Sequence, residues 1–369
     1  MRSSKKVLVI SQLPPPFHGS TVMTKTFLEA MEALNYEVVL VDRRFSQTVS
    51  NVGKFSLQKV ISALGLLGRT LRASADPSVD VCVFFVTNRS FSFIVDVVIS
   101  RILTIRKSLP VIAYVHTLGY RDLASRGLVH KRMVRALLGR GTQVVTLGTS
   151  LVSDVYPFTT QQPIIIANAL GDRVTEVDLD LSRKGGVLFF SNLIREKGID
   201  DFIACARELS ISQDGVNFYV AGAESFPGQY DELKDRIREM SLSTRIILLG
   251  PLDAEAKWDA LTASDILVFP STYRFEAQPL SVIEAAACAL PTIAYDTGAL
   301  ADLIVSGTSG IIVEPSDQYQ LLKSIESLLA DDDALVGLKR GARTQYETRF
   351  SFARYVRDWK AAIEKVSAL

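Results

Sequence analysis

The sequence predicts an α/β protein built from two doubly wound domains. The chain of 369 residues is long enough for two domains with a core each. Short apolar runs rich in β-branched residues alternate with helix-length amphipathic segments in both halves, which is typical of parallel sheets covered on both faces. A polar stretch without periodicity, at 171–186, separates the two series. We therefore expect domains at 1–170 and 186–350, followed by an amphipathic helix at 351–369.

Each predicted strand is a short apolar run that precedes a turn or a helix-length segment. In the first half the runs are VLVI, VVLV, VCVFFV, VIAYV, QVVTL and IIIA. In the second half they are VLFFS, VNFYVAG, IILLG, ILVFP, PTIAY and IIVEP. Open α/β sheets bind ligands beyond the carboxyl ends of their strands, so we expect the site there, in a cleft between the two domains.

The composition is that of a soluble globular protein, with 48% hydrophobic and 22% charged residues. Three cysteines without paired spacing favour a reducing compartment. The run VLVI is too short for a signal peptide, and no run approaches the roughly 18 apolar residues of a membrane span. We expect a cytoplasmic protein. The histidines, at 18, 116 and 130, are too scattered to indicate a zinc site.

The net charge of +1 conceals an asymmetry between the two halves. Residues 1–170 contain 20 lysines and arginines against 9 aspartates and glutamates, a balance of +11. The remainder contains 21 basic and 31 acidic residues, a balance of −10. Halves of opposite sign indicate modules with different partners.

Two features of the first half follow predicted strands. The loop QLPPPFHGS leads into a helix that begins near Gly19, where free N–H groups favour an anion. The alternative is an ordinary strand–helix turn, since both G-x-G-x-x-G and the P-loop pattern are missing from the loop. His116 follows VIAYV and could orient or polarise a substrate hydroxyl, or could simply be packed there.

In the second half, VLFFS runs into a loop that carries two cations, Arg195 and Lys197. The helix IDDFIACAREL follows this loop directly. The two cations could bind a phosphate group. The alternative is a solvated charge cluster in which they pair with Asp200 and Asp201.

A short helix that is apolar on nearly every side follows Pro279, yet Glu284 lies in its second turn. An unpaired buried carboxylate is very costly, so something must satisfy Glu284. Two ribose hydroxyls would do so, and Glu276 could meet a second polar group of the same ligand. Free N–H groups around Gln278 and Leu280 are expected to face that ligand. An internal lysine or arginine partner is the alternative for either glutamate.

Taken together, these residues resemble the retaining family-4 glycosyltransferases of the GT-B fold, of the bacterial surface-polysaccharide type. The resemblance covers essentially the whole chain. Its most specific part is the Glu-x7-Glu element formed by Glu276 and Glu284. The loop with Arg195 and Lys197, the AGAE stretch at 221–224, Gly19 and His116 follow the family's order. The resemblance implies two Rossmann-like domains facing a cleft, with the C-terminal helix packing towards the first domain.

The resemblance also implies roles for individual residues. Arg195 and Lys197 would hold the donor diphosphate, Glu284 would bind the nucleotide ribose, and Glu276 would contact the transferred sugar. His116 and Gly19 would line the acceptor side. The catalytic residues expected are therefore His116, Glu276, Arg195 and Lys197. The substrate-binding residues expected are Gly19, Ser191, Asn192, Gln278, Pro279, Leu280 and Glu284.

Three positions depart from the family pattern. Asn192 stands where many members of the family carry an arginine. The expectation is that Arg195 replaces that arginine, or that the diphosphate is bound less tightly. Ala169 and Leu290 replace glycines that are common in the family.

The reaction implied is transfer from a UDP-sugar, or a GDP-sugar, to a saccharide or lipid-linked saccharide acceptor, without metal or cofactor. A metal-dependent transferase of the other common architecture would need Asp-x-Asp after a strand. Asp178 and Asp180 lie in the polar linker, and 331–333 lies between helices, so both are expected to be solvated charges. The rival functions are a nucleotide-sugar epimerase of the same fold and a non-catalytic nucleotide-sugar-binding protein.

Two basic amphipathic segments of the first half, 53–72 and 120–140, indicate association with an anionic membrane, on the inner face of the cytoplasmic membrane. The alternative for either segment is a core-facing helix with a solvated basic rim. Nucleic acid is not expected as a partner, because this half lacks aromatic interleaving and known binding modules.

Overall fold

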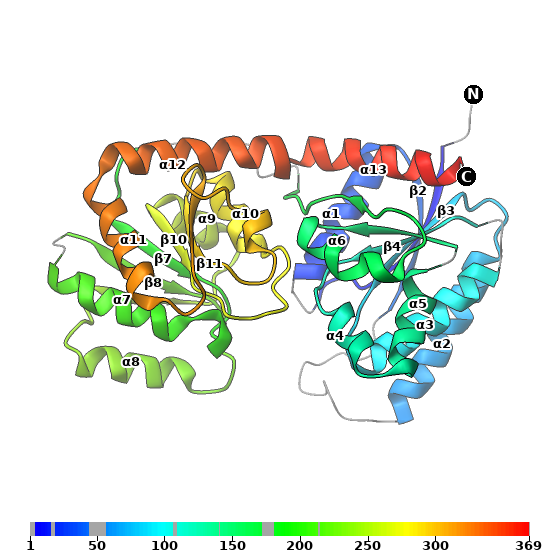
Figure 1. Cartoon of the computed structure of the whole chain (residues 1–369), viewed down its shortest axis with the longest axis horizontal. Helices are drawn as coiled ribbons and strands as arrows, with labels where there is room; N and C mark the ends of the chain where they lie inside the picture. Colours follow the sequence, from blue (N-terminus) through cyan, green and yellow to red (C-terminus); the bar gives the residue numbers. More distant parts are fainter. Residues whose placement is uncertain are drawn as a thin grey trace. The chain divides into compact units, whose positions relative to one another are not determined.

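The computed structural model describes residues 4–15, 19–43, 57–105, 109–139, 141–171, 181–212 and 215–368, without the side chains of 57–60 and 90. The chain divides into two compact units (Figure 1). Unit 1 consists of Met1–Gly171 and Phe352–Leu369, and unit 2 consists of Asp172–Ser351.

Unit 1 is a six-stranded parallel sheet in the order β2-β1-β3-β4-β5-β6. Its elements are β1 (Lys6–Ser11), α1 (Gly19–Ala33), β2 (Glu37–Asp42), α2 (Leu57–Ser74), β3 (Val81–Val86), α3 (Ser90–Ile105), β4 (Val111–Val115), α4 (Tyr120–Ser125), α5 (Leu128–Leu138), β5 (Thr142–Thr146), α6 (Thr149–Val155), the 3-10 turn η2 (Tyr156–Phe158), β6 (Ile164–Ile165) and α13 (Phe352–Ser367).

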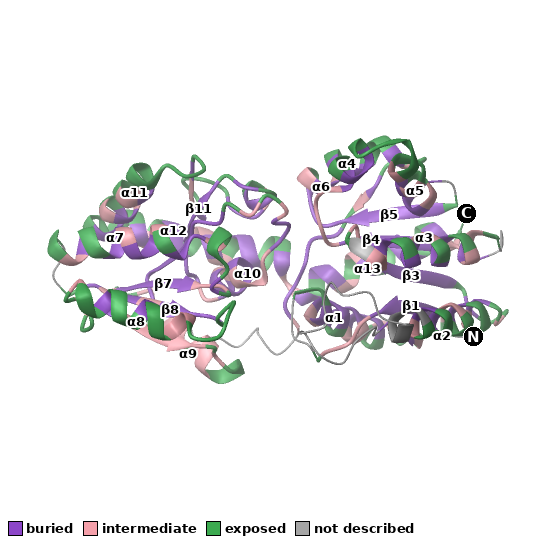
Figure 2. Ribbon diagram, turned by 90° about the horizontal axis from the view of Figure 1, so that it is seen from below, coloured by how far each residue is buried: buried purple, intermediate pink, exposed green. Residues whose placement is uncertain are grey.

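Helices cover both faces of this sheet. The C-terminal helix α13 packs against α1 and β3. Helices α2, α3 and α5 lie side by side on the other face (Figures 1 and 2). The central strand β3, VCVFFV, is buried along its whole length, as expected of a parallel strand between two helix layers.

Unit 2 is a second six-stranded parallel sheet, in the order β12-β11-β10-β7-β8-β9. Its elements are β7 (Gly186–Phe190), the 3-10 turn η4 (Arg195–Lys197), α7 (Ile199–Ser212), β8 (Asn217–Ala221), α8 (Gln229–Glu239), β9 (Ile246–Gly250), α9 (Ala254–Thr262), β10 (Ile266–Phe269), α10 (Leu280–Ala287), β11 (Thr292–Tyr295), the 3-10 turn η5 (Leu300–Asp302), β12 (Gly310–Val313), α11 (Gln318–Ala330), α12 (Asp332–Gln345) and the π-helical turn η6 (Tyr346–Phe350).

The predicted α/β class is confirmed, and a strand forms at each of the predicted apolar runs. The prediction of one basic amphipathic segment at 120–140 is wrong, because α4 ends at Ser125 and α5 begins at Leu128. Gly127 separates them with a φ of 141°, a conformation that favours glycine. Of the linker predicted at 171–186, the part that holds Asp178 and Asp180 lies outside the described residues, as do Lys54 and Arg140 of the basic segments.

The predicted acidic cluster between two helices has structural partners. Asp331 caps α12 by accepting a hydrogen bond of 2.9 Å from the backbone N–H of Ala334. Asp332 forms an exposed ion pair with Arg183 at 2.9 Å. Within the described residues, no helix combines the length and the hydropathy that crossing a bilayer requires.

Candidate functional site

In unit 2 the strand order reverses between β7 and β10, which lie next to each other in the sheet. From β7 the chain proceeds outward to β8 and β9, then returns to β10 and continues to β11 and β12. The loops after β7 and β10 therefore leave the sheet at the same edge, and their helices diverge. Such a reversal is where open α/β sheets bind ligands.

The two loops are joined by a buried ion pair. The Nζ of Lys197, in the loop after β7, donates to Oε2 of Glu276, in the loop after β10. Ser271 donates from Oγ to the same carboxylate oxygen at 3.1 Å. The ammonium group of Lys197 also lies 5.4 and 5.3 Å from the ring centroids of Phe269 and Tyr273, within cation–π range. The structure thus brings together two of the predicted site residues, and adds Ser271.

A glycine allows the two loops to approach this closely. Gly198, directly after Lys197, has a φ of 83°, and a Cβ there would lie 2.0 Å from the backbone oxygen of Pro270. The backbone N–H of Thr272 donates to the carbonyl oxygen of Glu196 at 2.8 Å and ties the loops together. Because both backbones are fixed, the Lys197 side chain reaches Glu276 from a defined position.

A second glycine supports Glu276 from the other side. Gly298 has a φ of 65°, and a Cβ there would lie 2.2 Å from the backbone oxygen of Glu276. The N–H of Ala299 donates to that oxygen at 2.9 Å. The backbone of Glu276 is therefore held between the loops that follow β10 and β11.

Glu284 also has a lysine partner. It lies on α10 and is 9% exposed, and its Oε1 accepts a hydrogen bond of 2.6 Å from Nζ of Lys257, on α9. The internal cation that the sequence left open as an alternative is thus present for both Glu276 and Glu284. Sequence reasoning missed Lys257, because a single lysine in the segment AEAKWDALT carries no pattern that distinguishes it from a solvated one.

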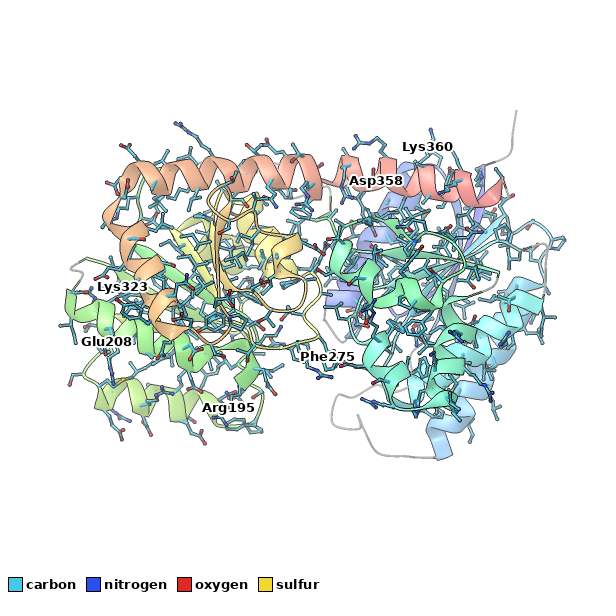
Figure 3. All side chains as sticks on the ribbon, in the orientation of Figure 1. Arg195, Glu208, Phe275, Lys323, Asp358 and Lys360 are labelled. Carbon is cyan, nitrogen blue, oxygen red and sulfur yellow. The ribbon has the colours of Figure 1, made fainter. Side chains whose placement is uncertain are left out.

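The alternative for the two cations of the β7 loop is wrong. Asp200 pairs with Arg236 at 2.5 Å, and Asp201 accepts a hydrogen bond of 2.9 Å from the hydroxyl of Tyr295. Lys197 turns to Glu276 instead, whereas Arg195 is exposed on the same 3-10 turn (Figure 3).

The remaining predicted residues of unit 2 surround the same strand ends. Ser191 and Asn192 follow β7 directly, and the Asn192 side chain accepts a hydrogen bond of 3.4 Å from the N–H of Ala223. Pro279 precedes α10 and Leu280 begins it, while Gln278 is buried. Pro279, at the N-cap position of α10, makes no side-chain capping bond, so the first N–H groups of the helix can face an anion.

The other two predicted residues, Gly19 and His116, lie in unit 1. Gly19 is the first residue of α1, and a Cβ there would meet no described atom within 4 Å. The ring of His116 stacks on that of Phe85 with 5.1 Å between centroids and an angle of 8°. Its Nε2 is buried and has no hydrogen-bond partner among the described residues.

Burial fixes the protonation state of His116. Desolvation lowers the pKa of the imidazole from 6.5 to about 3. The ring is therefore neutral at pH 7, and can donate or accept a hydrogen bond without carrying charge.

A carboxylate that the sequence reasoning missed fixes the loop after His116. Asp154, on α6, accepts hydrogen bonds of 2.9, 2.9 and 3.0 Å from the backbone N–H groups of Gly119, Tyr120 and Arg121. These are the first N–H groups of α4, which attract a negative charge. Among the described residues, no three His, Cys, Asp or Glu side chains cluster as a metal site would require.

The Lys197–Glu276 pair lies in a part of the chain that matches a known protein family. Residues 180–345 match the family model described as "Glycosyl transferases group 1". The match covers nearly all of unit 2 and includes Arg195, Lys197, Lys257, Glu276 and Glu284.

Curated relatives match over a similar part of the chain. The glycogen synthase of Mycobacterium tuberculosis H37Rv is 29% identical over 166 residues, which are 45% of this chain and 39% of that protein. The alpha-D-kanosaminyltransferase of Streptomyces kanamyceticus is 28% identical over 147 residues, which are 40% of this chain and 37% of that protein. The chain thus matches well under half of the length of these relatives.

Solved structures match along the entire chain. Sucrose-phosphate synthase from Thermosynechococcus elongatus has a TM-score of 0.77 at 16% identity, covering 99% of both chains. Anabaena Alr3699/HepE in complex with UDP and glucose has a TM-score of 0.71 at 16% identity, covering 99% of this chain and 100% of its own. The fold is GT-B. The predicted GT-B fold is confirmed, and the Lys197–Glu276 pair lies at the strand reversal of its second sheet.

We predict that Gly198→Ala lowers the melting temperature more than Gly228→Ala does. Both glycines have φ above 80°, so both alanines incur a backbone strain of about 1–2 kcal/mol. Only the Cβ at 198 also collides with backbone, at Pro270, whereas nothing lies within 4 Å of the Cβ at 228. Thermal unfolding of the two variants measures the difference, and equal losses would contradict the close approach of the loops.

We predict that His116→Phe makes stability less sensitive to acid. Because the folded-state pKa is about 3 and the unfolded value is 6.5, the unfolded chain binds a proton that the folded chain refuses between these values. Wild-type stability therefore falls as the pH drops below 6.5 towards 3, and the variant lacks this contribution. The melting temperature of the variant minus that of the wild type should rise from pH 7 to pH 4. A difference that stays constant with pH would show that the ring is not desolvated.

Proposed function

We propose that the protein is a retaining glycosyltransferase that moves a sugar from a nucleotide-sugar to a saccharide or lipid-linked saccharide. The observation that carries the proposal is the Lys197–Glu276 pair at the strand reversal, inside the segment that matches the group 1 glycosyltransferases. A largely buried ion pair of this kind contributes little to stability by itself, so its position near the N-terminus of α10 favours a binding role.

The donor diphosphate is assigned to the cations of the β7 loop. Arg195 is exposed, and Lys197 lies close to it on the same 3-10 turn. Together with the N–H groups of α10, they provide positive charge where negative charge develops on the leaving diphosphate. Preorganised groups of this kind are typically worth roughly 10²–10³ in rate each.

The ribose is assigned to Glu284, with Lys257 holding the carboxylate in place. Lys257 contacts Oε1, which leaves Oε2 able to accept a hydrogen bond from a ribose hydroxyl. Lys257 also balances the charge of Glu284, as Lys197 balances that of Glu276, so the two carboxylates repel an incoming diphosphate less strongly.

Roles for Glu276 and His116 are also part of the proposal. Glu276, whose carboxylate is held by Lys197, is proposed to bind the transferred sugar through hydrogen bonds. In unit 1, the neutral ring of His116 is proposed to form a hydrogen bond with an acceptor hydroxyl. The bond between the anomeric carbon and the phosphate oxygen breaks, and a bond to the acceptor oxygen forms on the same face of the sugar. The acceptor proton passes to the leaving phosphate.

The proposed donor is a UDP-sugar, with a GDP-sugar as the second candidate. Support for uridine comes from Anabaena Alr3699/HepE, whose solved complex contains UDP and glucose. The proposed setting is polysaccharide or glycolipid biosynthesis on the inner face of the cytoplasmic membrane. Its support is the balance of +11 in residues 1–170, since each basic residue near an anionic surface contributes about 1 kcal/mol.

A donor screen tests the proposed function. The full chain is incubated with individual UDP- and GDP-sugars, with and without a lipid-linked saccharide extract, and free nucleotide is measured. A transferase releases nucleotide in an acceptor-dependent manner. An epimerase instead turns over without acceptor, and a binding protein does not turn over at all. The anomeric configuration of the product, read by NMR, tests retention.

We predict that Lys197→Met reduces transfer by about 10²-fold or more, because it removes one preorganised cation. Removing one partner of a buried pair costs about 3–5 kcal/mol of stability, so a folded control is required. The double variant Lys197→Met/Glu276→Gln buries no charge and should fold, yet remain inactive. The control Lys323→Met removes a lysine that pairs with Glu326 on the surface of the same unit, and should retain activity (Figure 3). A folded double variant with near-normal turnover would rule out the assigned role.

We predict that turnover in EDTA equals turnover in magnesium within about two-fold. The expected positive charge at the diphosphate comes from Arg195, Lys197 and the α10 N-terminus, which chelation does not remove. Initial rates with excess EDTA and with added Mg²⁺ are compared directly. Loss of activity in EDTA that a divalent ion restores would contradict metal-independent transfer.

A further inference from the structure

Unit 1 has exposed apolar side chains that do not pack into its core. Helices α2, α3 and α5 lie side by side over one face of its sheet (Figure 2). Of the fifteen large apolar side chains that are exposed among the described residues, eight belong to these three helices. They are Ile61, Leu64, Leu71, Ile94, Val98, Ile105, Leu128 and Val129. We refer to these residues and the basic ones between them as the α2–α3–α5 face.

The apolar side chains follow helical spacing on the outer side of each helix. On α3, Ile94, Val98 and Ile105 recur at intervals of four and seven residues, which places them on one side of the helix. The opposite side of α3 is buried in the core, through Phe93, Ile99 and others. Helix α3 is therefore apolar on both sides, although only one side packs against the protein.

Helices α2 and α5 extend the same surface. On α2, Ile61, Leu64 and Leu71 are between 56% and 63% exposed. On α5, Leu128 and Val129 are exposed. Val134, Leu137 and Leu138 of the same helix are buried.

The charge on this face has one sign. The three helices contain a single acidic residue, Asp96, which is fully buried and paired with Arg43 at 2.5 Å. Exposed basic side chains stand among the apolar ones on all three helices. They are Arg69, Arg72, Arg101, Lys131, Arg132 and Arg135. An exposed surface of arginine, lysine and aliphatic side chains without exposed carboxylates fits an anionic partner that also accepts apolar groups.

We propose that the α2–α3–α5 face docks on an anionic lipid bilayer, with the aliphatic side chains of α2 and α3 inserted among the lipid headgroups. The basic side chains meet the phosphates, and the aliphatic ones enter the boundary of the acyl region. A nucleic acid would match the charge but leave the aliphatic side chains in water. The proposal agrees with the membrane setting of the proposed function but does not depend on the reaction.

The two kinds of side chain predict different responses to conditions. Attraction between the basic residues and lipid phosphates decays within a Debye length, so salt weakens it. Burial of aliphatic side chains does not depend on screening, so part of the binding should persist at 0.5 M salt (about three times physiological ionic strength). Charge alone would predict complete release by salt.

Sedimentation with vesicles tests the proposal on the full chain. The vesicles consist of phosphatidylethanolamine and phosphatidylglycerol, with phosphatidylcholine vesicles for comparison. One variant removes aliphatic groups at constant charge, Ile94→Ser/Val98→Ser/Ile105→Ser. A second removes charge at constant aliphatic content, Lys131→Gln/Arg132→Gln/Arg135→Gln. The control, Ile211→Ser/Tyr319→Ser, changes exposed apolar residues of unit 2. All substituted residues are exposed, so folding should be retained, and thermal unfolding checks this.

The wild type should sediment with the anionic vesicles. With phosphatidylcholine vesicles, it should remain in the supernatant. The aliphatic variant should lose about 10-fold in partitioning at all salt concentrations, and should lose the salt-resistant fraction. The charge variant should lose about 10-fold at low salt only, and the control should stay within about two-fold of the wild type.

Two results would overturn the proposal. One is a folded wild type that does not sediment with anionic vesicles. The other is an aliphatic variant that binds like the wild type. A third result would assign the face to a second copy of the chain instead. The wild type would not bind vesicles but would form dimers, measured by light scattering, and the aliphatic variant would not form them. Nucleotide release with a water-soluble acceptor is measured in parallel. This assay tests the proposed transfer reaction independently of vesicle binding.

Discussion

The reversal of strand order is the constraint on which the polar interior of each unit depends. In unit 1 it falls between β1 and β3, and in unit 2 between β7 and β10. Helices diverge to opposite faces there, so the strand ends are not covered by a helix. A buried ion pair lies near each reversal: Arg43–Asp96 in unit 1 and Lys197–Glu276 in unit 2.

The two ion pairs differ in their surroundings. Asp96 accepts hydrogen bonds from Arg43 and from the backbone N–H of Thr87, and Arg43 donates to the carbonyl oxygen of Phe85. Burial nevertheless raises the pKa of Asp96 to about 6. In unit 2, Lys197 and Glu276 lie on loops, next to an exposed arginine and a helix N-terminus. The first pair closes a core, whereas the second lies where a ligand can reach it.

Charge balance links the proposed donor site to the proposed membrane face. In unit 2 Glu276 and Glu284 each have a lysine partner, so that their carboxylates would repel the proposed diphosphate less strongly. In unit 1 the only acidic residue of α2, α3 and α5 is buried, so the exposed charged side chains of these helices are all basic. Burial of a carboxylate thus sets the sign of a surface as directly as the residues that are exposed.

The sequence by itself determined the strands and the α/β class, because parallel strands between helix layers must be apolar throughout. It also indicated that Glu284 needs a partner, since a carboxylate in an apolar helix is costly without one. Only the tertiary structure decided that the partners are Lys197, 79 residues from Glu276, and Lys257, 27 residues from Glu284. It likewise decided that Gly127 divides the basic segment into two helices and that Leu128 and Val129, at the start of the second, are exposed. The periodicity of a sequence indicates which side of a helix or strand is apolar. Strand order and helix breaks decide whether that side contacts the core or the solvent.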